Sequence, residues 1–324
     1  MSKVRTAVVG LNMGLAHAHA YHLSERSDLR WVVDLDEEKA AKVAKELNCQ
    51  HTADWRVALA DVDAISFATP HHLHAPMALE AIAAGKHVLI EKPLANTEED
   101  CLKLIQASED KGVTLMLAYI VRFRPAVQML KKLLDEQAYG KTINANCWIE
   151  GYLSPRPDTW FAKKDMLGGG VLFSHGCHYI DILIWLLGNP VQVAGLGTRV
   201  GTDWLEGEGT HHSVLQFESG ALGHLVCSWG LQYKSTPALL HVHTTEACFV
   251  LAGSKLDVIT KDGRQTLYEP TAPAIPNSSA LGEVDHFLEC IQTGKRPLTD
   301  GYEGLKSHRV VWALYSHQGT PVTL

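Results

Sequence analysis

The sequence has no CxxC pair and no closely spaced set of cysteines. Its seven cysteines are scattered over 324 residues, and an odd, dispersed set provides neither a disulfide framework nor a zinc knuckle. The apolar run after Lys3 and Arg5 is short and leads into a glycine turn, unlike the longer apolar region of a signal peptide. No run approaches the roughly 20 apolar residues that cross a bilayer. We therefore expect a cytoplasmic protein in a reducing compartment, without a membrane partner.

Positive charge is also scarce. The chain carries 29 Lys+Arg against 36 Asp+Glu, a formal net charge of -7, which is the wrong sign for holding a phosphate backbone. Nucleic acid is therefore not an expected partner. What is present, 46% hydrophobic and 20% charged residues, is typical of a globular protein, and the length predicts about two domains.

Short β-branched runs alternate with amphipathic helical stretches through the first third of the chain. Strands are predicted at 6–9, 31–33, 63–69, 87–93 and 113–119, and helices at 16–25, 36–47, 75–86 and 96–112. This alternation predicts an α/β fold that begins with a doubly wound parallel sheet of the Rossmann type. We expect residues 1–121 to form a dinucleotide-binding domain.

The pattern changes near residue 121, where strand-like runs such as 241–253 follow one another with little regular helix between them. Hairpin signals at Gly220 and at 261–265 predict a mostly antiparallel sheet. Two amphipathic helices, at 282–293 and 302–316, close the chain. We expect 122–324 to form a substrate-binding and oligomerisation domain, with the last helices able to pack back on the first domain.

The segment AVVGLNMGLAHAHA places Gly10, Asn12, Met13 and Gly14 between the first strand and its helix, where a dinucleotide diphosphate needs bare backbone N–H groups. It departs from GxGxxG, because Asn12 stands for the second glycine and the spacing is one residue shorter. Asn tolerates positive φ better than most residues. Asp34, at the end of the second strand, is placed to accept hydrogen bonds from ribose hydroxyls and to repel a 2′-phosphate, which favours NAD over NADP. The alternative is that the glycines only turn the chain and Asp34 caps the next helix.

Five motifs together resemble the Gfo/Idh/MocA oxidoreductases, the family of glucose–fructose oxidoreductase and inositol dehydrogenase. They are TPHHLH (69–74), AGKHVLIEKP (84–93), VRFRP (121–125), GGGVLFSHGCHYIDILIWLLG (168–188) and FLECIQTGKRPLTDGYEG (287–304). The resemblance implies a Rossmann domain, a C-terminal α/β domain with a large open sheet, a nicotinamide cofactor and a sugar or cyclitol substrate. It also implies a homodimer or homotetramer built through the open sheet.

Lys92 lies at the carboxyl end of a predicted strand, where ligands of doubly wound sheets bind, and Pro93 biases it toward an extended conformation. The resemblance assigns Lys92 a catalytic, proton-relaying role. Its ammonium group would stabilise negative charge on the reacting oxygen. The alternative is a surface lysine paired with Glu91.

His178 occupies the histidine position of the family's GGGxLxDxGxHxxD stretch, and imidazole titrates near neutrality, so we expect it to be the acid/base. The family's Asp, four residues earlier, is Ser174 here, which cannot supply a carboxylate charge. On an ideal helix Ser174 and His178 share a face, while His175 projects about 100° away. Asp181 faces the side of His178 and either orients His178 or a sugar hydroxyl, or is buried near the domain junction with a backbone partner.

The predicted site thus has two groups besides the catalytic pair Lys92 and His178. The cofactor-binding residues are Gly10, Asn12, Met13, Gly14, Asp34, Thr69, Pro70, His74, Glu91 and Lys92. The substrate-binding residues are Tyr119, Arg122, Trp160, Lys163, Ser174, His175, His178 and Asp181. The 18 histidines include no HExxH motif, so no metal site is expected.

The leading hypothesis is an NAD-dependent oxidoreductase, a dehydrogenase or reductase that transfers a hydride between the cofactor and a secondary alcohol or ketone of a sugar, sugar derivative or cyclitol. One alternative keeps the fold and NAD but uses transient oxidation and elimination to hydrolyse a glycosidic bond. The other is a dinucleotide-binding regulator without turnover, against which the presence of both Lys92 and His178 argues.

Overall fold

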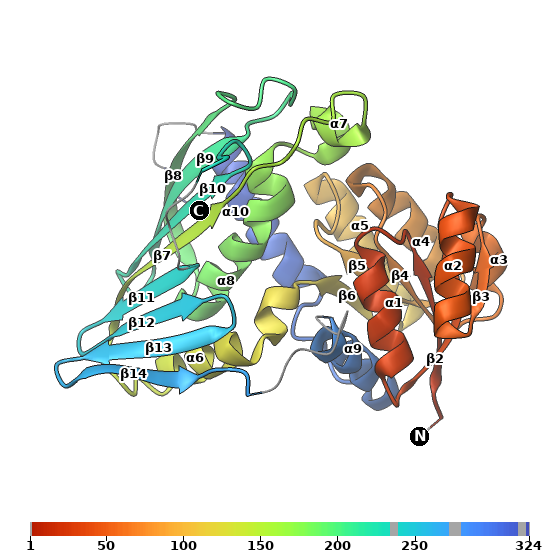
Figure 1. Cartoon of the computed structure of the whole chain (residues 1–324), viewed down its shortest axis with the longest axis horizontal. Helices are drawn as coiled ribbons and strands as arrows, with labels where there is room; N and C mark the ends of the chain where they lie inside the picture. Colours follow the sequence, from red (N-terminus) through yellow and green to blue (C-terminus); the bar gives the residue numbers. More distant parts are fainter. Residues whose placement is uncertain (1, 234–238, 272–279, 317–321, 324) are drawn as a thin grey trace. The chain divides into compact units, whose positions relative to one another are not determined.

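The computed structural model describes residues 2–233, 239–271, 280–316 and 322–323. The chain divides into two compact units (Figure 1). The first comprises the described residues of Met1–Ile120 and Ala274–Leu305, and the second those of Val121–Pro273 and Lys306–Leu324. The range 122–324 expected for the second domain therefore contains a segment, 280–305, that clusters with the first unit.

The first unit is built on six parallel strands in the order β3-β2-β1-β4-β5-β6. The strands are β1 (Val4–Val9), β2 (Ser27–Val33), β3 (Gln50–Thr52), β4 (Ala64–Phe67), β5 (His87–Glu91) and β6 (Leu115–Ala118). Its helices are α1 (Gly14–Leu23), α2 (Glu37–Leu47), α3 (Trp55–Leu59), α4 (His74–Ala83), α5 (Glu98–Lys111) and α9 (Leu281–Thr293), with a 3₁₀ turn η1 (His71–Leu73). The predicted doubly wound sheet is confirmed. Because the strand order reverses between β1 and β4, ligands of such a sheet bind beyond the carboxyl ends of these strands.

Burial explains why the strands β4, β5 and β6 are mostly apolar. β4 and β6 are buried at every residue, and β5 is buried at its three central residues. A parallel sheet covered by helices on both faces requires such runs.

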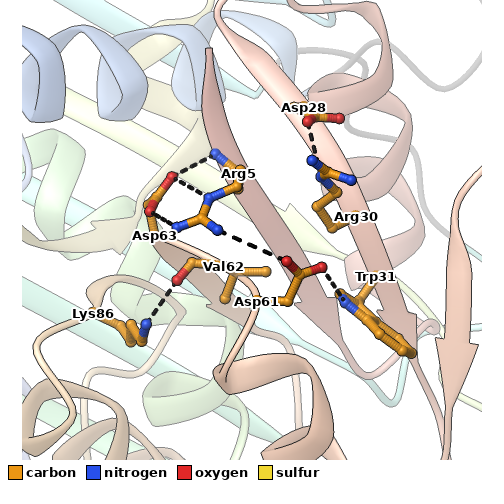
Figure 2. A network of polar contacts seen from close by, with 8 residues as sticks. All are labelled: Arg5, Asp28, Arg30, Trp31, Asp61, Val62, Asp63 and Lys86. Carbon is orange, nitrogen blue, oxygen red and sulfur yellow. Dashed lines mark hydrogen bonds and ion pairs between the residues drawn. The ribbon is translucent and has the colours of Figure 1, made fainter. Parts of the chain in front are cut away.

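Polar side chains connect the strands at the opposite, amino-terminal edge of this sheet (Figure 2). Arg5 of β1 donates two hydrogen bonds to Asp63, at 2.6 and 3.1 Å. Asp61 accepts a bond of 3.1 Å from Nε1 of Trp31 in β2 and lies 3.8 Å from Arg5. Charged side chains at this edge therefore fix β1, β2 and the segment before β4, and the carboxyl edge is left for binding.

The second unit is built on a sheet of nine described strands in the order β14-β13-β12-β11-β7-β10-β9-β8-β15. The strands are β7 (Thr142–Glu150), β8 (Pro190–Thr198), β9 (Thr210–Phe217), β10 (Leu222–Ser228), β11 (Leu240–Thr244), β12 (Cys248–Ala252), β13 (Lys255–Thr260), β14 (Gly263–Tyr268) and β15 (Val322–Thr323). Only β7 and β10 pair in parallel. The predicted α/β unit on a mostly antiparallel sheet is confirmed.

Helices of the second unit pack on one face of this sheet. They are α6 (Pro125–Asp135), α8 (Cys177–Leu187) and most of α10 (Gly301–Ser316). The unit also has the 3₁₀ turn η2 (Ile120–Phe123), a π-helical turn η4 (Leu172–Gly176), and the short helix α7 (Lys164–Leu167), which contacts the 3₁₀ turn η3 (Trp160–Ala162). α8 contacts β7 and β10, and α6 contacts β12 and β13. Along β9, His211, Leu215 and Phe217 are buried while Val214 is 45% exposed, which is the alternation of a sheet with one packed face.

One helical stretch, Lys164–Leu187, is long and apolar enough to cross a membrane by length and composition, but 78% of its apolar window is buried within the structure. The sequence-based expectation overlooked this run. Its burial is that of a core helix of a folded unit.

Candidate active site

The glycine turn after β1 packs directly on the end of β4. Gly10 has φ +87°, and a Cβ there would lie 2.5 Å from the carbonyl oxygen of Ala68. A Cβ on Gly14 would lie 2.9 Å from Cγ1 of Val8. Only glycine allows this approach, which sets the N-terminus of the ten-residue helix α1 beside the carboxyl ends of β1 and β4.

The expectation that Asn12 stands in the turn because it tolerates positive φ was wrong. Among the described non-glycine residues, positive φ occurs at Asn48 and Gln137 and not at Asn12. The shorter turn needs no second left-handed residue, because Met13 is already helical at φ -76°, ψ -36°. The side chain of Asn12 instead accepts a 2.8 Å hydrogen bond from Nζ of Lys39, while Met13 is 62% exposed.

Asp34 lies one residue past β2 and binds the glycine turn. Its carboxylate accepts hydrogen bonds from the backbone N–H of Leu11 at 2.7 Å and of Asp36 at 3.0 Å, and from Nζ of Lys39 at 3.1 Å. Burial would raise the pKa of Asp34, but these bonds and the charge of Lys39 hold it below its ordinary value. Asp34 is therefore ionised, and it does not cap α2, whose N-cap is Asp36.

The segment after β4 is fixed to the segment after β5 by a buried imidazole. Nδ1 of His74 lies 2.7 Å from the carbonyl of Pro93, and Nε2 lies 2.8 Å from the carbonyl of Thr69. His74 is fully buried and contacts both loops. Burial lowers the pKa of His74, and the two carbonyl contacts partly offset this effect. The buried hydroxyl of Thr69 has no hydrogen-bond partner among the described residues, which fits a ligand group at this edge. Pro70 begins the turn that follows.

Glu91 and Lys92 end β5. Oε1 of Glu91 lies 3.3 Å from Nε2 of the buried His17 in α1, and Oε2 accepts a 3.2 Å bond from the backbone N–H of Lys92. Lys92 is half-buried, and its peptide bond to Pro93 is cis. Tyr119, just past β6, is fully buried. The first unit thus brings the predicted cofactor residues and Lys92 to one edge of its sheet.

In the second unit, Ser174 and His175 lie in the π-helical turn η4, and His178 follows in α8. The shared face and the 100° angle expected from an ideal α-helix do not apply there, because a π turn contains more residues. Ser174 is 2% exposed, whereas His175 and His178 are half-buried. Nε1 of Trp229 donates toward Nδ1 of His175 at 3.4 Å.

A buried carboxyl group and a tyrosine, both missed in the sequence, support this turn. Glu208 accepts hydrogen bonds from the N–H of Leu172 at 3.0 Å and from the hydroxyl of Tyr315 at 2.8 Å, and the same hydroxyl accepts a bond from the N–H of Phe173. Burial raises the pKa of Glu208. A Cβ on Gly170 would lie 2.2 Å from the carbonyl oxygen of Glu208. The GGG run at 168–170 is therefore the sequence feature that could have indicated a close approach of the chain here.

Arg122 and Asp181 bind each other. Two hydrogen bonds, of 2.8 and 2.5 Å, join the guanidinium to the carboxylate, and both side chains are 1% exposed. The guanidinium also lies 5.3 Å from the ring centroid of Trp185. Asp181 is therefore buried, as the structural alternative expected, and it is paired with the side chain of Arg122.

The remaining predicted substrate residues belong to an aromatic segment. Lys163 is half-exposed and pairs with Glu206 at 2.9 Å. The ring of Trp160 lies 5.2 Å from that of Phe161, which lies 5.0 Å from Trp229. Phe161 and Trp229, which the sequence analysis did not single out, connect Trp160 to His175. Within the described ranges, no cluster of three or more His, Cys, Asp or Glu could hold a metal ion.

A doubly wound sheet with a glycine turn, a helix N-terminus and an ionised Asp34 defines a dinucleotide-binding protein. Residues 4–119 match the oxidoreductase family with an NAD-binding Rossmann fold, and residues 127–255 match the GFO/IDH/MocA C-terminal domain. The chain belongs to the Gfo/Idh/MocA oxidoreductases, which confirms the resemblance, the NAD-binding domain and the class of enzyme, a dehydrogenase or reductase acting on CH–OH groups.

Three similar proteins illustrate this relationship. Levoglucosan dehydrogenase of Pseudarthrobacter phenanthrenivorans is 28% identical over 83% of this chain and 80% of its own. The 1,5-anhydro-D-fructose reductase of Ensifer adhaerens is 30% identical over 78% and 75%. The structure of an aldose-aldose oxidoreductase from Caulobacter crescentus, complexed with glycerol, superposes with a TM-score of 0.88 at 26% identity, covering 99% of this chain and all (100%) of that one.

Proposed function

We propose that this protein transfers a hydride between NAD and a secondary alcohol or ketone of a sugar, a sugar derivative or a cyclitol. The observation that carries the proposal is the edge of the first unit's sheet, where an ionised Asp34, the Gly10 turn and Lys92 lie at the carboxyl ends of β2, β1 and β5. The names of the two relatives above indicate the same class of substrate.

The first unit has the groups to hold NAD. The N–H groups at the start of α1 would bind the diphosphate, and Asp34 would accept bonds from the ribose hydroxyls. The unpaired hydroxyl of Thr69 offers a further contact. A carboxylate at position 34 repels a 2′-phosphate, so we favour NAD over NADP. When bound, the cofactor accepts or supplies the hydride.

The chain's own groups handle the proton and the charge. Lys92 would stabilise negative charge on the reacting oxygen, and His178 would take up or return the hydroxyl proton. A neutral His175 whose Nδ1 accepts from Trp229 carries its proton on Nε2, which makes it a donor for a substrate oxygen. Ser174 contributes a hydroxyl where the family has a carboxylate.

The decisive experiment compares the wild type with Lys92→Ala on a panel of sugars, anhydrosugars and inositols with added NAD. We expect wild-type NADH formation that matches substrate loss, and at least about a hundredfold lower kcat in Lys92→Ala, since one electrostatic stabiliser is worth about that much. NADH affinity, measured by fluorescence titration, should be nearly unchanged. Retained turnover, or a parallel loss of NADH affinity, would refute the role of Lys92.

Ser174 supports a second candidate, a glycosidase that retains NAD, because a site without the family carboxylate departs from the standard redox constellation. Aryl glycosides in the same panel test it. Aglycone release without net NADH formation would favour this candidate. If neither aglycone release nor NADH formation is detected, the result would favour a dinucleotide-binding regulator.

We further propose a cytoplasmic homodimer or homotetramer that associates through the open face of the second unit's sheet. On that face Leu196 is 64% exposed and Leu222 is 47% exposed. Apolar side chains gathered on one sheet face favour association.

A further inference from the structure

Three ionisable side chains form a buried cluster behind Lys92, all within the first unit. Nε2 of His17 in α1 lies 3.3 Å from Oε1 of Glu91 in β5 and 3.9 Å from Oε2 of Glu283 in α9. The side chains of His17 and Glu283 are 1% and 0% exposed. The roles predicted for the glycine turn and for Glu91, Lys92 and Pro93 do not explain why two carboxyl groups and an imidazole lie together where solvent hardly reaches.

The two carboxyl groups hold their protons differently. Burial raises the pKa of Glu283 well above its ordinary value, and the charge of Glu91 adds to this effect. Burial also acts on Glu91, but hydrogen bonding and charge from His17, together with Lys92 and His74, lower its pKa overall. Glu283 therefore stays a neutral acid where Glu91 is ionised.

Two ionisable groups packed near the cluster have pKa values shifted toward their neutral forms. Tyr21 of α1 pairs with Ser66 of β4 at 2.7 Å, and burial raises its pKa, so it stays neutral. Burial lowers the pKa of His74, which favours its neutral form. Neither oxygen of Glu283, nor Nδ1 of His17, has a hydrogen-bond partner in the part of the chain that the structure describes.

The cluster reaches Lys92 through Glu91. One oxygen of this carboxylate faces His17, and the other accepts the backbone N–H of Lys92. We propose that His17 and Glu283 are positioning residues for Lys92: Glu283 keeps its proton, His17 donates to Glu91, and Glu91 holds the carboxylate charge of the cluster in a fixed place beside the lysine. This inference rests on the proposed function, because it assumes that Lys92 acts in catalysis.

The charge state of Glu283 can be tested without any substrate. Glu283→Gln replaces a neutral acid by a neutral amide of the same shape. In the wild type, Glu283 ionises on unfolding above about pH 4.3 but stays protonated when folded, so stability falls as pH rises. We expect the Tm of Glu283→Gln, relative to wild type, to increase steadily from pH 5 to pH 8. A Tm loss that is the same at every pH would mean that Glu283 is ionised, and would overturn the proposal.

The positioning role is tested with His17→Leu, which removes the donor to Glu91, and His17→Gln, whose amide restores a donor. His22→Gln, an exposed position on the same helix, is the matched control. With the best substrate of the panel, we expect about tenfold lower kcat and a shifted pH profile in His17→Leu, with KM and NADH affinity within about twofold, and substantial recovery in His17→Gln. Equal losses in both variants, or lost NADH affinity, would indicate a merely structural residue and refute the role.

The two proposals fail in different ways. If Lys92→Ala retains turnover, the proposed function fails. If Lys92→Ala is inactive while His17→Leu is fully active, only the positioning role fails.

Discussion

The carboxylate of Asp34 closes the glycine turn by accepting a hydrogen bond from the N–H of Leu11. In the proposed function, the same carboxylate accepts hydrogen bonds from the ribose hydroxyls. Its neighbour Lys39 lies within hydrogen-bond distance of both Asp34 and Asn12. The residue that we propose sets cofactor preference therefore also shapes the turn that we propose binds the diphosphate.

We predict that Asp34→Ala weakens NADH binding at least about tenfold and NADPH binding much less, because two charge-assisted bonds to the ribose are lost while Lys39 is released to meet a 2′-phosphate. Fluorescence titration with both cofactors measures this preference. Asp28→Ala, at the other end of β2, should leave both affinities unchanged. Equal weakening for NADH and NADPH would contradict the assignment.

At the scale of elements, the segments that carry the predicted substrate residues Arg122, Ser174 and His175 form 3₁₀ and π-helical turns rather than regular α-helices. The π turn η4 is anchored by Glu208 and Tyr315, and the Arg122–Asp181 pair joins η2 to α8. The regular helix α5 has a local cap instead: the hydroxyl of Thr97, its N-cap residue, accepts a hydrogen bond from the N–H of Asp100 at 3.1 Å. The side chain of Asp100 binds the same hydroxyl rather than the backbone.

We predict that Asp181→Ala lowers the free energy of unfolding by about 3–5 kcal/mol, because it removes the carboxylate that pairs with the buried guanidinium of Arg122. Urea denaturation followed by circular dichroism measures the loss. The double variant Arg122→Met with Asp181→Leu should lose clearly less, since it removes both charges. A single-variant loss below about 1 kcal/mol would show that water reaches the pair.

At the scale of the whole molecule, the chain leaves its first unit at Ile120 and returns to it with α9. His17 in α1 lies beside Glu283 in α9, and Ser24 bonds to Asp285. The described helices of the second unit that contact its broad sheet pack on one face, and the opposite face is where we propose that an oligomer forms.

We predict that the wild type elutes as a dimer or tetramer and that Leu196→Asp shifts it toward the monomer, because a charge on the exposed face of β8 opposes burial of that face. Size-exclusion chromatography with light scattering gives the mass. Leu102→Asp, an exposed leucine of α5 at 43% exposure, is the control that should not change it. A wild type that is monomeric at micromolar concentration would contradict the oligomer proposal.

The sequence by itself determined the doubly wound sheet, the glycine turn and the family, because these follow from local periodicity and from short motifs whose backbone demands are contained within a few residues. It did not predict β3, α3 or β8, which are short or only weakly patterned, and it read the two strands β11 and β12 as a single run.

Only the tertiary structure decided which polar residues pair in the interior. It placed Arg122 against Asp181, Glu208 under the π turn, and His17 between Glu91 and Glu283, all pairs from distant parts of the chain. The physical reason is that the protonation and role of a buried group depend on its desolvation and on its neighbours in space, and neither is recorded in the spacing of residues along the chain.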